Sequence, residues 1–222
     1  MVMSFFRRPE ESGLENIESQ DQRMDNDAPH TFDLALSAVT GGAVETVADE
    51  IRETDRQINA TEVEIRRALL VHASVHGGID TPEVLAFMNM IKDLERIGDY
   101  NKNIFDLAEE GVSFTESPEL ETILSLRDEV SSRISLMGEI LSVRDEERAR
   151  TYIERGDEMR KDFDRRVNEL LHSTEAAVTA VPKALLFRFL KRVSAHSSNV
   201  VSAVVMPVDQ LDYFDESEDT RL

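Results

Sequence analysis

Hydrophobic residues recur every three or four positions along most of the chain, which is the spacing of one face of an α-helix. The clearest run lies between residues 43 and 75, where the steps are three, four or seven residues: Val44, Val47, Ile51, Ile58, Ile65 and Leu69. The strict alternation of apolar and polar residues that is typical of a half-buried strand does not appear in the sequence. The pattern therefore predicts an all-α protein.

Glycines and prolines divide this pattern into helices. Pro29 is expected to interrupt the first helix, and glycines are expected to end helices at three places: Gly41-Gly42, Gly77-Gly78 and Gly111. Thr81-Pro82 and Ser117-Pro118 each resemble an N-cap residue followed by a proline in the first turn, and Asp145 can cap a further helix. The predicted helices span about residues 14–40, 43–75, 81–110, 117–143, 145–174 and 182–206. Long helices with short connections favour a bundle.

The two halves of the chain resemble each other. The stretch "LERIGDYNKNI" (94–104) aligns with "LKRVSAHSSNV" (190–200), and "ETDRQIN" (53–59) aligns with "DFDRRVN" (162–168). Two matches in the same order predict a duplicated three-helix unit. The predicted organisation is a flexible tail (1–13), a first repeat (14–113), a second repeat (114–208) and an acidic tail (209–222).

The composition restricts the possible partners and surroundings. The formal net charge is −20, from 45 acidic and 25 basic residues, so the surface repels nucleic-acid phosphates and anionic lipids. High acid content with little Lys suits a protein that works in concentrated salt, although ordinary compositional drift explains it equally well. There is no Cys. No stretch approaches the roughly 20 apolar residues of a membrane span, and the N-terminus lacks the apolar run of a signal peptide. A cytoplasmic protein is expected.

Three carboxylates on neighbouring predicted helices form the candidate site. Glu95 and Asp99 lie one helical turn apart beside the apolar positions of the third helix. Asp55 falls on the apolar stripe of the second helix, where a lone carboxylate is costly unless it is paired or binds a metal ion. Arg52 and Arg56 could neutralise Asp55 as ion-pair partners. Alternatively, Asp55, Glu95 and Asp99 could together bind a divalent or iron cation.

The other polar residues do not indicate catalysis. His72 and His76 are interpreted as packing or helix-end residues, and His196 as an isolated structural residue. The arginines at 148–150 and 165–166 are interpreted as solvated helix faces. The sequence has no Gly-rich phosphate loop, nucleophile elbow or zinc-binding His-Glu-x-x-His motif, so an enzyme is not expected.

The stretch "DLERIGDYNKNI" resembles the signature of the PhoU family, accessory regulators of phosphate transport. The resemblance extends over about residues 14 to 214. It implies two three-helix bundles in a non-enzymatic, cytoplasmic and dimeric regulator. Such a regulator acts on a phosphate transporter or a sensor kinase, with any membrane association made through the transporter. Two other interpretations remain open: a carboxylate-bundle protein for metal storage, and a chaperone-like helical module.

The resemblance also implies a metal site of the form Glu/Asp-x-x-x-Asp in each repeat. The first repeat keeps Glu95, Asp99 and Asp55, although Asn59 stands where a second carboxylate of the preceding helix is expected. In the second repeat the aligned residues are Lys191, Ala195, Asp164 and Asn168. Protonated lysine cannot bind a metal ion, and alanine has no ligand atom. The second site is therefore expected to be lost, with Lys191 forming a salt bridge to Asp164 in place of a cation.

Overall fold

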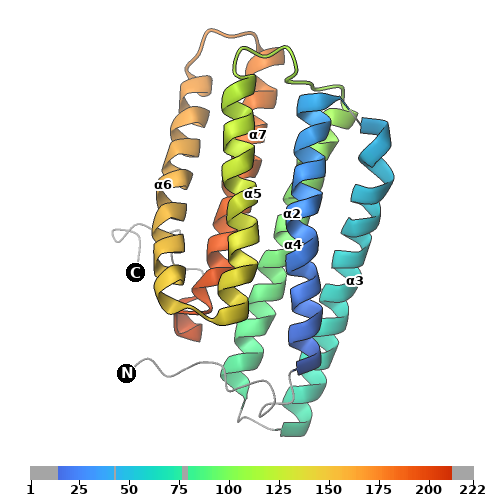
Figure 1. Cartoon of the computed structure of the whole chain (residues 1–222), viewed down its shortest axis with the longest axis vertical. Helices are drawn as coiled ribbons and strands as arrows, with labels where there is room; N and C mark the ends of the chain where they lie inside the picture. The colour runs from blue at the N-terminus through green and yellow to red at the C-terminus, as the bar shows by residue number, and fades with distance from the viewer. Residues whose placement is uncertain (1–14, 43, 77–79, 212–222) are drawn as a thin grey trace.

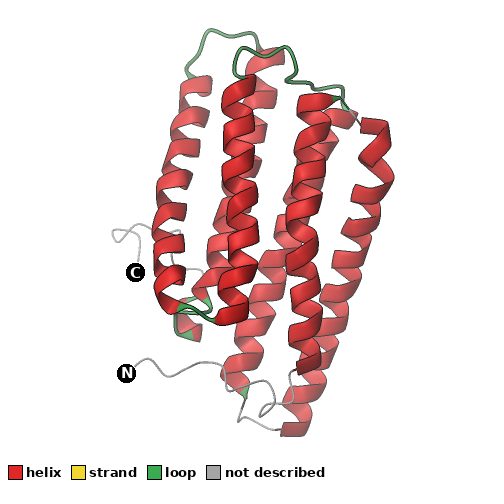
Figure 2. Cartoon of the chain, viewed as in Figure 1, coloured by secondary structure: helices red, strands yellow, loops and turns green. Residues whose placement is uncertain are grey.

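The chain folds into a bundle of long helices, as predicted. The computed structural model describes residues 15–42, 44–76 and 80–211. These residues form six α-helices and a short 3-10 helix, with no strand among them: α2 (Glu15–Gly41), α3 (Val44–His76), α4 (Thr81–Glu109), α5 (Leu120–Val143), α6 (Glu146–Leu171), α7 (Ala177–Ser202) and η1 (Val208–Gln210). Figure 2 shows the helices lying side by side, with loops only at their ends. The predicted tail at 1–13 and the acidic tail from residue 212 onward lie outside the described residues.

The helices form two three-helix units that pack through their central members. In Figure 1 the unit α2–α4 lies on the right and the unit α5–α7 on the left. Helix α4 packs along α7, and α2 packs along α5, while α3 and α6 flank the bundle. The duplication in the sequence corresponds to an approximate two-fold relation in space. If the helices α2, α3 and α4 are exchanged with α5, α6 and α7, the α4–α7 contact and the α2–α5 contact are each unchanged.

The apolar stripes predicted from the sequence form one continuous core. On α3 the buried residues include Ile51, Ile58, Ile65 and Leu69, at the expected spacing of three, four or seven. On α4 the row of Ile91, Leu94, Ile97 and Ile104 is fully or almost fully buried. Each such side chain stabilises the fold by roughly 1.5–3 kcal/mol through burial. The helical periodicity was thus a sound guide to the core.

Prolines end helices less often than the sequence suggests. Helix α2 continues through Pro29, and its second half is anchored by the fully buried Phe32 and Leu36. Helix α7 begins at Ala177, ahead of Pro182, so the predicted start at Pro182 is wrong. Inside a helix, a proline removes the hydrogen bond to the carbonyl four residues earlier, and its ring crowds that carbonyl. For Pro182 that carbonyl belongs to Val178, which is highly exposed and can bind water instead.

The predicted helix caps are correct at one of three places. The Asp145 carboxylate accepts a hydrogen bond from the Arg148 backbone N–H at 3.0 Å and so caps α6. Helix α4 has Asp80 rather than Thr81 at its N-cap, and the Asp80 carboxylate binds His72 instead of the helix backbone. Helix α5 begins at Leu120, because Ser117-Pro118 forms a turn in which Leu120 N–H donates to the Ser117 carbonyl.

No helix in the described ranges is both long enough and apolar enough to cross a membrane.

Candidate functional site: α3 and α4 and their counterparts α6 and α7

The three carboxylates predicted from the first repeat face the same region between α3 and α4. The pKa of Asp55 is raised, mainly because the residue is partly buried and then because the negative charge of Asp99 lies nearby. Glu95 and Asp106 add to this repulsion, while Lys102 opposes it. The fold therefore concentrates negative charge around Asp55, as the spacing in the sequence suggested.

Bases on α4 itself neutralise Glu95 and Asp99. Lys92 Nζ lies 2.6 Å from a Glu95 oxygen, and Arg96 Nη1 lies 3.0 Å from an Asp99 oxygen. Both pairs join residues three positions apart, so they form on one helix without help from a neighbour. Asp55 lacks such a pair among the described residues and relies on the more distant charge of Lys102.

The arginines expected to neutralise Asp55 have other partners. Arg52 forms an ion pair with Glu109 on α4. Arg56 pairs with Glu53 on its own helix, at 2.6 Å. The alternative in which Arg52 and Arg56 rescue Asp55 is therefore wrong, because nearer carboxylates compete for both guanidinium groups.

The arrangement of these carboxylates does not form a ready-made cation site. In the described part of the chain, no three His, Asp or Glu side chains are grouped closely enough to hold a metal ion. A cation binding to Asp55, Glu95 and Asp99 would have to displace Lys92 and Arg96 from the two α4 carboxylates. The assignment of a metal to these three residues stays a prediction.

The corresponding face of the second repeat carries the salt bridge expected from the alignment. Lys191 Nζ lies 2.8 and 2.7 Å from the two oxygens of Asp164. Lys191 aligns with Glu95, and Asp164 aligns with Asp55. Ala195, which aligns with Asp99, is almost fully buried. On this face, the ammonium group of Lys191 thus takes the place of a bound metal ion.

A buried hydrogen bond joins the two repeats where α4 meets α7. Asp93 and His196 are each less than a tenth exposed, and His196 Nδ1 lies 2.6 Å from Asp93 Oδ1. Asn199 Nδ2 donates to the same oxygen at 3.2 Å. The expectation that His196 stands alone is therefore wrong. Its partner is 103 positions away, a distance at which the sequence contains no pairing signal.

The same contact reveals the approximate two-fold relation at the level of side chains. Positions 93 and 100 of α4 align with positions 189 and 196 of α7. Asp93 packs against His196, and the corresponding pair, Phe189 and Tyr100, has ring centroids 6.0 Å apart. The Tyr100 and His196 rings also stack on each other, with centroids 5.7 Å apart. One pair is hydrogen-bonded and the other aromatic, in symmetry-related places.

The other two histidines interpreted from the sequence have the structural positions expected of them. His72 Nε2 lies 2.9 Å from an Asp80 oxygen, which ties the end of α3 to the start of α4. His76 lies in the last turn of α3, and its ring stacks on that of His72 with centroids 4.2 Å apart.

The arginines divide into exposed and buried groups. Those of the pairs 148–150 and 165–166 have acidic partners near the surface, as predicted; Arg150, for example, lies 3.9 Å from Glu146. Arg133 and Arg160 are buried, and the sequence analysis missed both. The available signal was spacing, because Arg133 falls in the stripe of Leu126, Val130, Met137 and Ile140, which is otherwise apolar and buried.

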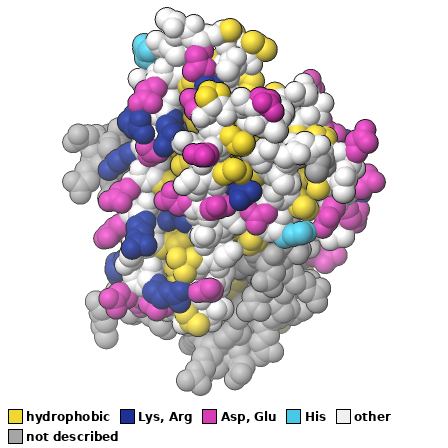
Figure 3. Space-filling model, turned by 45° about the horizontal axis from the view of Figure 1, so that its top comes forward, with side chains coloured by type: hydrophobic (Ala, Val, Ile, Leu, Met, Phe, Trp, Pro, Cys, Tyr) yellow, Lys and Arg dark blue, Asp and Glu magenta, His cyan; other side chains and the backbone are white. Residues whose placement is uncertain are grey.

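Helix α6 makes its side of the molecule more basic than the opposite side. It carries more Lys and Arg residues than any other described helix. Figure 3 shows most of the dark-blue side chains on the left, the side of α6, whereas magenta side chains prevail on the right, the side of α3. A strongly acidic protein thus concentrates its positive charge on the second repeat.

Comparisons with known proteins agree with this architecture. Residues 22–108 match the family model of the PhoU domain. A PhoU homolog from Synechocystis sp., described as a phosphate-specific transport system accessory protein, is 24% identical over 200 residues, which cover 87% of this chain and 88% of the relative.

Two solved structures have the same fold. The crystal structure of PhoU from Pseudomonas aeruginosa superposes with a TM-score of 0.75 at 19% identity, covering 89% of this chain and 97% of that one. The phosphate transport system regulatory protein PhoU from Streptococcus pneumoniae superposes with a TM-score of 0.76 at 16% identity, covering 95% and 98%. The protein is therefore an all-α tandem of two three-helix bundles with the PhoU fold. Together with the PhoU domain match over residues 22–108, this confirms the resemblance to the PhoU family.

Proposed function

We propose that this protein is a non-enzymatic accessory regulator of phosphate uptake or phosphate signalling. It acts by contact with a phosphate transporter or with a sensor kinase. The observation that carries the proposal is the PhoU domain in the first repeat, combined with the PhoU fold over nearly the whole chain. The Synechocystis relative, named as an accessory protein of phosphate-specific transport, supports the same role.

The surface offers two regions suited to contact with a protein partner. Large apolar side chains are exposed around the α3–α4 connection and around the α6–α7 connection: Leu70, Val71, Val75 and Leu85 in the first repeat, and Leu171, Val178, Val181 and Leu185 in the second. These connections lie at opposite ends of the molecule (Figure 1). Exposed apolar groups gathered in one place mark interaction sites more often than scattered ones do.

The test is phosphate uptake by cells of the source organism that lack the gene. Deletion is expected to change the uptake of radioactive phosphate, and the wild-type chain to restore it. The double variants Val71→Glu with Val75→Glu, and Val178→Glu with Val181→Glu, should restore it less well, because a charge opposes apolar contact. Val143→Glu is the matched control, since Val143 is equally exposed but lies on α5. Unchanged uptake after deletion would contradict the proposal.

We further propose that the regulator is a homodimer whose first repeat is modulated by a divalent or iron cation at Asp55, Glu95 and Asp99. Light scattering at physiological and molar salt tests the dimer, and a monomer at both would refute it. For the cation, elemental analysis should find metal in the wild type and none after Glu95→Gln with Asp99→Asn. A chelator should lower the melting temperature of the wild type only, because a bound ligand stabilises the folded state by mass action. A metal-free wild type with unchanged melting would exclude cation modulation.

A further inference from the structure

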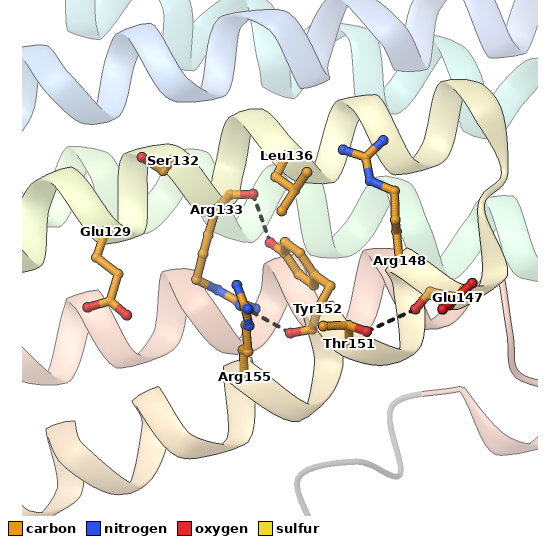
Figure 4. A pocket seen from close by; sticks show the side chains of 9 residues that line it. All are labelled: Glu129, Ser132, Arg133, Leu136, Glu147, Arg148, Thr151, Tyr152 and Arg155. Carbon is orange, nitrogen blue, oxygen red and sulfur yellow. Dashed lines mark hydrogen bonds between the residues drawn. The ribbon is translucent and has the colours of Figure 1, made fainter.

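A groove runs between α5 and α6 because the outer helices of the two repeats pack differently. Helix α3 packs against both α2 and α4, whereas α6 packs closely along α7 and meets α5 at few positions. The resulting cavity has a volume of about 490 Å³. Figure 4 shows Arg133 reaching into it from α5 and Arg155 from α6.

Arg133 is buried in this groove without a countercharge. Its side chain rests on the Tyr152 ring, with Cζ 3.9 Å from the ring centroid, and the residue is 7% exposed. Its donors reach only neutral oxygens: Nη1 donates to the Tyr152 carbonyl and Nη2 to Ser198 Oγ, each at 3.1 Å. Its Nε has no hydrogen-bond partner, and no carboxylate of the described residues lies within salt-bridge distance.

Positive and negative groups both lie near Arg133. Burial lowers the pKa of Arg133 most, Tyr152 raises it, Arg160 lowers it, and the smaller effects of Glu129 and Arg155 oppose each other. Arg155 is exposed and has no ion-pair partner in the described ranges. A buried charge without a partner is costly, and an anionic ligand that supplies the missing charge would reduce this cost.

We propose that the groove between α5 and α6 binds a phosphate oxyanion, free or carried on a small organic molecule, between Arg133 and Arg155. Guanidinium groups present paired N–H donors that match phosphate oxygens. Ser132 lines the same groove. The cavity exceeds the size of a single phosphate ion, which leaves room for an attached organic group. The anion site rests on Arg133 and Arg155, whereas the choice of phosphate among oxyanions rests on the proposed function.

Isothermal titration calorimetry with inorganic phosphate, glycerol 3-phosphate and sulfate, at constant low ionic strength, tests this site. We expect saturable binding of one phosphate or glycerol 3-phosphate per chain, and weaker binding of sulfate. Arg155→Gln should weaken the binding at least tenfold while leaving the helical circular dichroism unchanged, because Arg155 is exposed. Arg133→Lys should weaken it as well, since lysine keeps the charge and loses the paired donors. Arg150→Gln is the control, because Arg150 is also exposed on α6 but does not line the groove.

Three results would overturn the inference. Absence of saturable binding up to about 10 mM of each anion would exclude the site. Equal binding by wild type and Arg155→Gln would exclude its location. Sulfate bound as tightly as phosphate would exclude phosphate as the ligand. The uptake experiment above does not depend on any of these outcomes, so failure of the anion site and failure of the regulatory role can be told apart.

Discussion

The two repeats share a helix order and an aligned signature, but their outer helices, α3 and α6, pack differently. In the first repeat the positions of α3 that face the core include Val47 and Ile51, and α3 packs against both neighbours. The residues of α6 that align with these are Gly156 and Arg160. A glycine allows α6 to approach α7 and Arg133 closely, and the buried arginines keep a polar interior. Duplicated helices can therefore keep their fold while a few substitutions turn a packed contact into a groove.

The acidic faces show a second divergence. The first repeat keeps Asp55, Glu95 and Asp99 together, with mutual repulsion at Asp55. The second repeat has replaced this arrangement by the Lys191–Asp164 salt bridge. The proposed cation site therefore lies in the first repeat, and the proposed anion site lies in the second.

The largest expected effect comes from filling the close approach at Gly156. A Cβ at this position would lie 2.7 Å from Arg133 Nη2 and closer still to Ser198 Oγ, so Gly156→Ala must displace these buried side chains or the helices that carry them. We expect a loss of about 1–3 kcal/mol in the free energy of unfolding, measured by urea denaturation. In the first repeat, Gly98→Ala should cost less, because its Cβ would meet only the end of the Ile58 side chain, at 3.1 Å. An equal or larger effect at Gly98 would refute this difference between the repeats.

The symmetry-related pairs between α4 and α7 allow a swap that copies one pair onto the other. Asp93→Phe alone leaves His196 and Asn199 without their shared acceptor and should cost about 1–3 kcal/mol. Adding His196→Tyr reproduces the Phe189–Tyr100 pair. The double variant should therefore be more stable than the sum of the two single variants predicts, by about 0.5–3 kcal/mol. Simple additivity in urea denaturation would show that the two places are not equivalent.

The smallest effects are expected at the aligned aspartates, and they should have opposite signs. Asp164→Asn removes the partner of Lys191 and should lower the stability by about 0.2–1 kcal/mol, as is usual for a surface pair. Asp55→Asn removes a partly buried, repelled charge and should raise the melting temperature slightly in the absence of metal. If Asp55 binds a cation, the same substitution should instead lower the melting temperature of the metal-loaded protein. The sign of the change in melting temperature therefore shows whether Asp55 binds a cation.

The effect of Asp55 should also depend on pH. Its pKa in the folded protein is raised, so the folded state holds the proton more tightly than the unfolded state does. The ionised group therefore destabilises the fold at neutral pH, and the penalty disappears as the pH falls below the unfolded value of about 3.9. The gain in stability from Asp55→Asn should be largest at pH 7 and should decrease as the pH falls toward 4. A gain that stays constant over this range would contradict a charge effect.

The sequence by itself determined the helices, their approximate ends, the duplication and the Lys191–Asp164 bridge. These features depend on local spacing or on aligned positions, and both can be followed along one chain. The sequence also contains the apolar stripe of α5 that includes Arg133, but the role of this arginine depends on the side chains that face it from other helices. The start of α7 was misjudged because the cost of Pro182 depends on whether the carbonyl of Val178 reaches water.

Only the tertiary structure decided which helices pack closely and which side chains meet across the bundle. Asp93 and His196 are 103 positions apart, and Arg133 and Ser198 are 65 apart. Local periodicity places each residue on a helix face, but it does not specify how each helix is rotated about its axis relative to its neighbours. That rotation, set by packing the side chains of the whole core at high density, brought Asp93 and His196 together and left the groove between α5 and α6.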